Sequence, residues 1–470
     1  MVNTNNSVID KYKKGLLIIQ VLISTLVSAA SFEFWWIRDD YAHLARVLSP
    51  VFIPGADFQF FRPVFDMIFW LGAESPEGLP LGARLISACI YLALTLSVSH
   101  FAISIGMSRF AALIASLLVA SHPLTYETTV WICAMSGPLT EALGLVALGL
   151  VCSSKHEKNN ALRWGMACVL LFVGLMTKES MLSYILLVSI VMIAKLVRKQ
   201  APPKALIFLT AVIFPAAIYT SFGFTKALES SLYKIGEIKF SLIDSLSLWG
   251  SYLAAVVFPI TEKGMVPNLV DWHLPMSVGL ALGAGLIAAT LYFKPKNWKL
   301  LLLWLAIAPL PYLFFHWGVI SRYSITMVIP ISLLLATPLS KVKRNSKLIP
   351  VIYGIFMIAL ISFGLYSRWE SPAVKGWRLE GEVSRYIQQS ILQEKEDSIK
   401  TIGYYGFPFH MGWGDTSEQI RDIAAYTHPR HSYQIQQFSE FPGCPAPSGT
   451  LLFFYRDGHF QKCTPDKQNK

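Results

Sequence analysis

Long apolar runs constrain the fold of this chain more than any other feature. They cover residues 81–105, 110–120, 161–176, 181–194, 205–222, 276–293, 300–315, 325–339 and 348–365. A helix crosses a bilayer with about 20 mainly apolar residues, or slightly fewer when flanking side chains reach the headgroups. Only 15% of the residues are charged, whereas soluble chains carry about 25%. The sequence therefore predicts an all-α polytopic membrane protein.

The first apolar run, residues 16–32, follows two lysines and resembles a signal peptide in outline. It is longer than a typical signal-peptide core, and no soluble body follows it. We expect an uncleaved first span.

The net charge of +11 comes from basic residues that crowd into short connections between the runs. These clusters occupy residues 11–14, 155–163, 195–204, 294–299 and 341–347. Lysine and arginine accumulate in the cytoplasmic loops of membrane proteins, where they meet anionic headgroups. The charge therefore indicates topology, with membrane lipid as a partner, and we expect no nucleic acid partner.

All these clusters can lie in the cytoplasm only if residues 245–260 do not cross the bilayer completely. A full crossing there would place residues 294–299 and 341–347 outside, against the charge rule. We therefore expect about eleven transmembrane helices, with 245–260 as a re-entrant or interfacial helix. Residues 1–366 then form the transmembrane domain, and residues 367–470 lie outside.

The tail has the pattern of a small extramembrane α/β domain. The predicted elements are helices at 376–394 and 415–426 and strands at 399–405, 433–438 and 451–455. Cys444 and Cys463 lie in this polar region and could form a disulfide in an oxidising compartment, although their spacing does not prove it.

Under this topology the conspicuous polar residues of the membrane part converge on the outer side. They are Asp39, Asp40, Arg62, His122, Glu127, Lys178, Glu179, Arg322 and Tyr323. Charges so close to hydrocarbon are costly, which favours a functional interpretation. Structural interpretations stay open for His122, which could begin or end a helix, and for Lys178 with Glu179, which could be a snorkelling pair. We expect Arg46 and Arg84 to be solvated loop charges.

Two acids beside several cations suit phosphate-dependent transfer to a hydroxyl group. Acids can deprotonate an incoming hydroxyl or hold a divalent metal, and arginine and lysine neutralise a departing phosphate. Nucleotides stay in the cytoplasm, and the sequence has no phosphate-cradling GxxxxGK[ST] loop or dinucleotide fingerprint. A phosphate outside would arrive on a lipid carrier, which points to a polyprenyl-phosphate-linked donor.

Five segments resemble the GT-C superfamily of integral membrane glycosyltransferases, particularly the TPR-containing O-mannosyltransferases and their bacterial relatives. They are RDDY at 38–41, FRPVFD at 61–66, HPLTYETTVWI at 122–132, LMTKES at 175–180 and SRYSITMVIP at 321–330. An acidic pair in the first outer loop is the hallmark of that superfamily.

The resemblance implies an inverting hexosyl- or pentosyltransferase that uses a polyprenyl-phosphate-linked sugar donor and a protein or glycan acceptor. Asp39 or Asp40 would activate the acceptor hydroxyl. The lipid phosphate would be bound by Arg62, Lys178 and Arg322, with His122 and Tyr323 nearby. No cofactor is certain, although a divalent metal ion at Asp39 and Asp40 is one option.

Two departures from those relatives limit what the resemblance implies. After Trp131 they often continue into a Gly-Arg stretch, whereas ICAMSGPL follows here. No TPR array follows the last span, so the acceptor cannot be inferred from them.

Two other classes of membrane protein remain as alternatives. A transporter would place ionisable groups near the bilayer midplane and show two related halves. A flippase or polymerase of lipid-linked saccharides would rely on arginines and histidines in a large outer loop. The outer segments contain no N-x-[ST] sequon, which suits a bacterial inner membrane with the active site facing the periplasm.

The two adjacent acids are expected to have different roles, because neighbouring side chains diverge by about 100° on a helix and point apart on a strand. We expect Asp39 to be the base or the metal-facing acid, since it comes first after the span. We expect Asp40 to cap the helix at 41–48, where a carboxylate accepts backbone N–H bonds.

The topology can be tested by labelling single introduced cysteines from each face of the membrane. Cysteines within 155–158, 195–204 and 341–347 should react only from the cytoplasmic side, because positive loops stay inside. Cysteines in the tail should react only from outside. A tail that reacts only from the cytoplasm would overturn the sidedness.

Overall fold

The structure is a computed structural model of the whole chain, and it describes most of the residues. The described ranges are 4–49, 52–54, 61–73, 80–153, 160–199, 207–208, 210–211, 213–218, 242–257, 276–293, 298–310, 321–341, 348–370, 372–394, 399–407, 416–428, 431–456 and 459–464.

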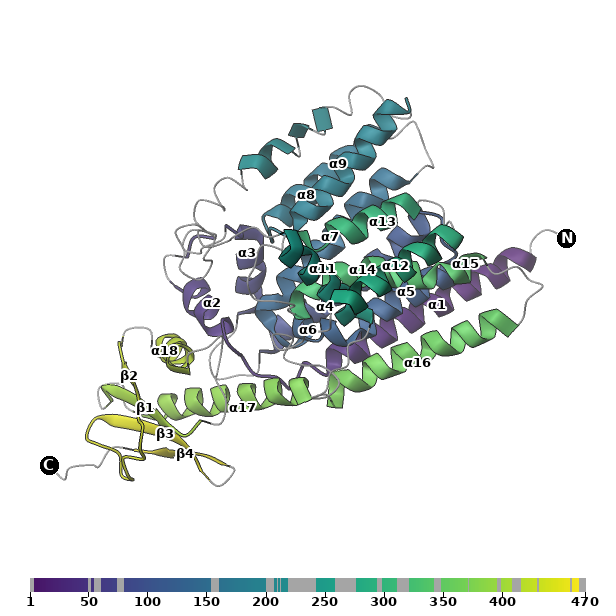
Figure 1. Cartoon of the computed structure of the whole chain (residues 1–470). Helices are drawn as coiled ribbons and strands as arrows, with labels where there is room; N and C mark the ends of the chain where they lie inside the picture. Colours follow the sequence, from purple (N-terminus) through teal and green to yellow (C-terminus); the bar gives the residue numbers. More distant parts are fainter. Residues whose placement is uncertain are drawn as a thin grey trace.

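Helices form the body of the molecule, and a small sheet lies near the C-terminus (Figure 1). The helices of the first part are α1 (Thr4–Ala29), α2 (Asp40–Val47), α3 (Pro63–Gly72), α4 (Leu81–Ser104), α5 (Arg109–Ser121), η1 (Pro123–Thr125), α6 (Glu127–Val130), η2 (Ile132–Met135), α7 (Ser136–Cys152), α8 (Asn160–Leu175) and α9 (Met181–Val197). They are followed by α11 (Leu242–Val257), α12 (Met276–Phe293), α13 (Trp298–Ile307), α14 (Ser321–Ala336), α15 (Pro338–Lys341), α16 (Leu348–Glu370), α17 (Pro372–Leu392) and α18 (Thr416–Thr427). The strands are β1 (Thr401–Tyr405), β2 (Gln434–Gln437), β3 (Thr450–Arg456) and β4 (His459–Cys463).

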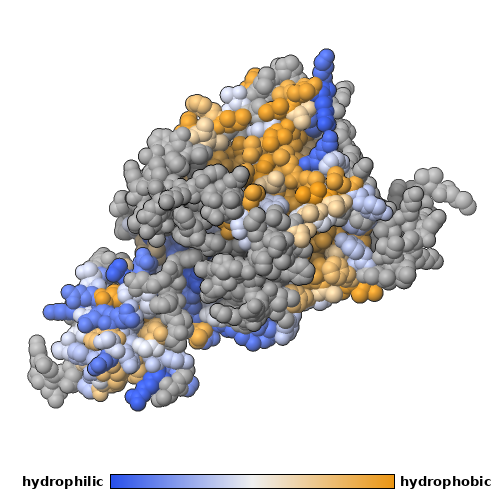
Figure 2. Space-filling view, viewed as in Figure 1, coloured by the Kyte–Doolittle hydropathy of each residue, from blue (hydrophilic) through white to orange (hydrophobic). Residues whose placement is uncertain are grey.

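The body carries apolar side chains on its outer surface, as a membrane protein does. On α8, the side chains of Leu162, Met166, Val169 and Phe172 recur every three or four residues and are at least half exposed. Such a stripe on an outward helix face suits contact with lipid. Figure 2 shows apolar surface over the body and more polar surface over the sheet region.

Three of the described helices are long and apolar enough to cross a membrane: Leu81–Ser104, Ile132–Cys152 and Arg322–Ser340. A fourth results if Arg109–Ser121 and Pro123–Val130, which meet at a bend of 59°, count as one span. The polytopic membrane character is therefore confirmed, whereas the count of eleven crossings stays a prediction.

The segment predicted to be re-entrant overlaps α11, whose residues Tyr252, Leu253 and Ala254 are buried in the main core of the body. This helix of 16 residues packs against α12 and α14. Residues 258–260 lie outside the described ranges, so whether the segment crosses stays a prediction.

The C-terminal elements form the small α/β unit that the sequence predicts. The strand order is β2-β1-β3-β4, with β1 parallel to both neighbours and β4 antiparallel to β3. A parallel pair needs a crossover connection, and α18 lies between β1 and β2 in sequence. The strand β4 was not predicted, because the sequence HFQKC contains few apolar residues and mostly faces outward. Cys444 and Cys463 form a disulfide with their α-carbons 5.6 Å apart.

The loop that follows α1 and the C-terminal unit share one hydrophobic core. Trp36 and Tyr41 belong to the same buried cluster as Ile387 of α17, Ile420 of α18 and Phe453 of β3. Helix α2 packs directly on α18 (Figure 1). The C-terminal unit therefore packs against the segment of the membrane part that carries Asp39 and Asp40.

Candidate active site

Asp40 is completely buried and links two loops through backbone hydrogen bonds. Its Oδ2 accepts from the N–H of Ile37 at 3.1 Å, and its Oδ1 accepts from the N–H of Cys133 at 2.9 Å. The predicted capping role is wrong, because α2 begins at Asp40 itself and the carboxylate bonds outside that helix. Burial raises the pKa of Asp40 to about 6, although the Cys133 contact and the nearby Arg84 charge oppose the rise.

Arg84 provides the positive charge beside Asp40, and it has no exposed surface. Its guanidinium donates to the carbonyl oxygens of Trp35 at 2.9 Å and Phe34 at 3.3 Å, and also to that of Val130. The prediction of a solvated loop charge is therefore wrong. Five donors on a planar group let arginine replace water with several carbonyl oxygens at once, which offsets its desolvation.

Arg46 was also predicted to be solvated, and the structure pairs it instead with Asp66. Two Arg46 nitrogens contact the two Asp66 oxygens, and Arg46 Nη2 lies 3.2 Å from His43 Nδ1. Because Asp66 is buried, the pair joins α2 to α3 inside the protein rather than at its surface.

Asp39 has the opposite environment to Asp40. It is half-buried, and no residue that the structure describes donates a hydrogen bond to its carboxylate. Burial raises the pKa of Asp39, while the positive charges of Arg322 and Arg38 act to lower it. The carboxylate is therefore available to a ligand, and it lies close enough to Arg322 for their charges to interact.

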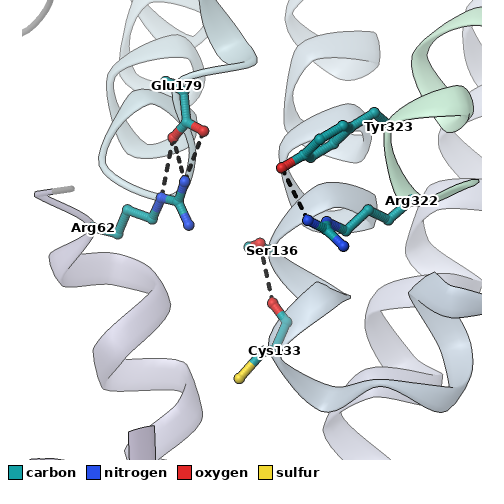
Figure 3. A network of polar contacts seen from close by, with 6 residues as sticks. All are labelled: Arg62, Cys133, Ser136, Glu179, Arg322 and Tyr323. Carbon is teal, nitrogen blue, oxygen red and sulfur yellow. Dashed lines mark hydrogen bonds and ion pairs between the residues drawn. The ribbon is translucent and has the colours of Figure 1, made fainter. Parts of the chain in front are cut away.

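Arg322 lies at the start of α14, and two acids and two aromatic rings surround it. Its backbone N–H donates to Glu127 Oε2 at 3.1 Å, and its Nη2 donates to the Tyr323 hydroxyl at 3.2 Å (Figure 3). The guanidinium carbon lies 5.0 Å from the centre of the Trp131 ring and 4.6 Å from that of Tyr323. Arginine over aromatic faces is held in place without losing its charge.

Lys178 and Arg62 are two further positive charges near Arg322. The Lys178 ammonium lies 5.1 Å from the centre of the Tyr323 ring, and its side chain is buried. Arg62 forms a bidentate ion pair with Glu179 at 2.7 Å, so Glu179 pairs with Arg62 rather than snorkelling with Lys178 (Figure 3). Burial lowers the pKa of Lys178, in the turn between α8 and α9, to about 7.

Both ring nitrogens of His122 form hydrogen bonds with backbone groups. Nδ1 accepts from the N–H of Leu124 at 3.2 Å, and Nε2 lies 2.9 Å from the carbonyl oxygen of Val256. These contacts fit the structural interpretation of His122, at the bend between α5 and η1.

Two buried charges that the sequence did not single out support this region. Arg368, at the end of α16, donates to the Tyr91 hydroxyl at 2.8 Å, to Thr129 Oγ1 at 3.0 Å and to Thr125 Oγ1. It thereby holds the loop that carries Glu127 and Trp131. Glu141 of α7 accepts from the Tyr184 hydroxyl at 2.6 Å and contributes negative charge near Lys178. Charged residues inside apolar helices were the signal available for both.

The residues that the structure describes do not fit a metal centre. None of their His, Cys, Asp and Glu side chains form a group of three or more that could hold an ion. Both oxygens of Asp40 are occupied by backbone N–H groups, which leaves Asp39 alone among the two candidate ligands.

Comparison with solved structures places this architecture among known folds. No protein-family model matches the chain, and no curated protein matches it. The oligosaccharyltransferase of Archaeoglobus fulgidus, solved in complex with zinc and sulfate, has a TM-score of 0.51 at 13% identity over 90% of this chain and 62% of that chain. This chain has the GT-C fold.

Two further GT-C structures match with lower scores. ArnT from Cupriavidus metallidurans, bound to undecaprenyl phosphate, has a TM-score of 0.48 at 11% identity, over 91% of this chain and 86% of that chain. The arabinofuranosyltransferase AftD from Mycobacteria has a TM-score of 0.47 at 15% identity, over 90% of this chain and 33% of that chain. The match to the oligosaccharyltransferase, of whose length this chain spans 62%, confirms at the level of the fold the resemblance predicted from the sequence motifs.

The different environments of the two acids predict different effects on stability. Asp40→Asn replaces one acceptor oxygen with a donor, so either the Ile37 or the Cys133 N–H loses its partner. An unsatisfied buried donor costs about 1–3 kcal/mol, and the melting temperature in detergent should fall by several degrees. Asp39→Asn breaks no hydrogen bond to a described residue and should melt like the parent. Equal losses in both variants would contradict this assignment.

Proposed function

We propose that this GT-C protein is an inverting glycosyltransferase. It would move a hexosyl or pentosyl group from a polyprenyl-phosphate donor to a hydroxyl group of a protein or glycan acceptor. The observation that carries the proposal is an Asp39 carboxylate without a hydrogen-bond donor among the described residues, close enough to Arg322 for their charges to interact. A base and a phosphate-binding cation are thus paired at the outer ends of the spans.

Asp39 is the proposed general base. A base works best when its pKa approaches the operating pH, and burial raises the pKa of Asp39. The acceptor hydroxyl would transfer its proton to Asp39 while its oxygen attacks the anomeric carbon. The bond from that carbon to the phosphate oxygen breaks, and the lipid phosphate leaves with the electron pair.

Lys178 and Arg322 are the proposed phosphate ligands. Both are buried, and a preorganised cation in a water-poor site stabilises charge more strongly than one in water. Arg62 keeps its ion pair with Glu179, so its contribution is to hold the turn of Lys178 and to add positive charge. The oligosaccharyltransferase with the same fold was solved with sulfate, which supports the capacity of this fold to receive a tetrahedral anion.

The location follows from the same chemistry. A lipid-borne phosphate and a water-borne hydroxyl meet at the membrane surface, where the first outer loop leaves α1. We propose that this surface is the periplasmic face of a bacterial inner membrane. The disulfide between Cys444 and Cys463 supports an oxidising compartment for the tail.

The function is tested by incubating purified protein with a labelled polyprenyl-phosphate sugar and measuring sugar transfer and release of lipid phosphate. Asp39→Asn should lower transfer by about 10²-fold to 10⁴-fold, the usual contribution of a general base, with donor binding unchanged. Glu33→Gln is the control, because Glu33 is an exposed acid of the same loop. Full activity of Asp39→Asn would refute the role of Asp39. A parent protein that moves the intact lipid without releasing phosphate would instead indicate a transporter or flippase.

Lys178 should make donor binding depend on pH. Because its pKa is lowered to about 7, the ammonium is present below that pH and is lost above it. Affinity for the polyprenyl phosphate should therefore fall by up to about tenfold per pH unit as the pH rises above the pKa of the free protein, and should level off above the higher pKa that Lys178 has with the anion bound. Lys178→Arg keeps its charge and should bind with little pH dependence over the same range. Identical pH profiles for the two proteins would exclude Lys178 as the titrating group.

A further inference from the structure

The backbone that presents Asp39 has an uncommon conformation. Arg38, which immediately precedes it, has φ of +51°, in the left-handed region that non-glycine residues rarely adopt. The direction of the Asp39 side chain depends on this angle. Such a conformation persists where surrounding contacts determine it, and several of those contacts come from α17.

Arg38 is held by two residues of α17. Its guanidinium carbon lies 3.9 Å from the centre of the Trp377 ring, and its Nε donates to Glu380 at 3.1 Å and 3.3 Å to the two oxygens. Glu380 is buried, with 4% of its surface exposed. Stacking and a charged hydrogen bond together restrict the guanidinium more than either does alone.

Gln388, two turns further along α17, holds residues on both sides of the acidic pair. Its Oε1 accepts from Trp35 Nε1 at 2.9 Å and from the Tyr41 hydroxyl at 3.0 Å. Between these anchors Gly381 allows close packing, because a Cβ at that position would lie 3.3 Å from the Trp35 nitrogen. Spacings of three, four and seven residues put Trp377, Glu380, Gly381 and Gln388 on one helix face.

We propose that α17 is the positioning element for the catalytic carboxylate. Trp377 and Glu380 act through Arg38, Gln388 acts through Trp35 and Tyr41, and Arg84 with Asp40 holds the segment from the membrane side. The C-terminal unit is therefore required for the geometry of the site and is more than an appended domain. The catalytic consequence rests on the proposed role of Asp39, whereas the anchoring itself does not.

The anchoring is tested by hydrogen exchange of a peptide covering residues 35–43 in the full-length protein. Glu380→Ala and Gln388→Leu should each speed its exchange at least about tenfold, because each removes bonds that hold the segment. Glu382→Gln and Gln389→Leu are matched controls, since both residues are exposed on the same helix. Unchanged exchange in the first two variants would overturn the inference, and this readout needs no turnover.

The catalytic consequence is tested by kinetics normalised to donor-binding sites. A displacement of about 1 Å can cost about 10²-fold in rate, so kcat for transfer should fall steeply in Glu380→Ala and Gln388→Leu while donor affinity stays within twofold. Glu380→Gln keeps an acceptor for Arg38 Nε and should recover part of the rate. A merely structural role would lower the number of binding sites and leave kcat per site unchanged, and that result would overturn the positioning role. Full activity of Asp39→Asn would be a separate failure, of the proposed base.

Discussion

The buried Asp40 carboxylate, with Arg84 beside it, is the interaction on which the candidate site depends. Asp40 joins the loop after α1 to Cys133, and Arg84 joins the same loop to Val130. Each alone would be a costly buried charge. Together, with backbone partners for both, they hold the two loops in a single arrangement. The positions of Asp39 and of Trp131 beneath Arg322 both follow from it.

Other charged residues of the site fall into two groups: some are satisfied by ion pairs within the protein, and others could bind a ligand. Asp66 with Arg46, and Glu179 with Arg62, are ion pairs whose partners satisfy each other. Glu127 and Tyr323 bond to Arg322 while its guanidinium remains beside aromatic faces. Lys178 is buried near other cations, which is unfavourable in the free protein. A bound phosphate would relieve that repulsion, so the electrostatic cost of the site becomes binding free energy for an anion.

The C-terminal unit extends this arrangement beyond the helical body. Its α18 packs on α2, its α17 is hydrogen-bonded to Trp35, Arg38 and Tyr41, and the core residues of both parts form one cluster. Shared packing therefore couples the position of residues 35–41 to that of the C-terminal unit.

The sequence by itself determined the class of the fold, and it supplied the candidate residues of the site. Apolar run length predicted a helical membrane body, and periodicity predicted α17, α18 and the strands β1 to β3, all confirmed within the described residues. The RDDY motif and three cations, Arg62, Lys178 and Arg322, suggested the chemistry that we propose, because residue type can be read directly from the sequence. The number of crossings was not decided by these signals, nor was strand β4, whose residues show little apolar alternation.

Only the tertiary structure decided which acid is buried and which is available. Asp40 finds its partner Cys133 93 residues away, Glu127 meets Arg322 across 195 residues, and Glu380 reaches Arg38 across 342. Arg46 and Arg84 were predicted to be solvated for the same reason: nothing near them in sequence indicates the carboxylate or carbonyl oxygens that replace water around them. Whether a charge is paired depends on contacts between distant segments, and these form only when the helices pack.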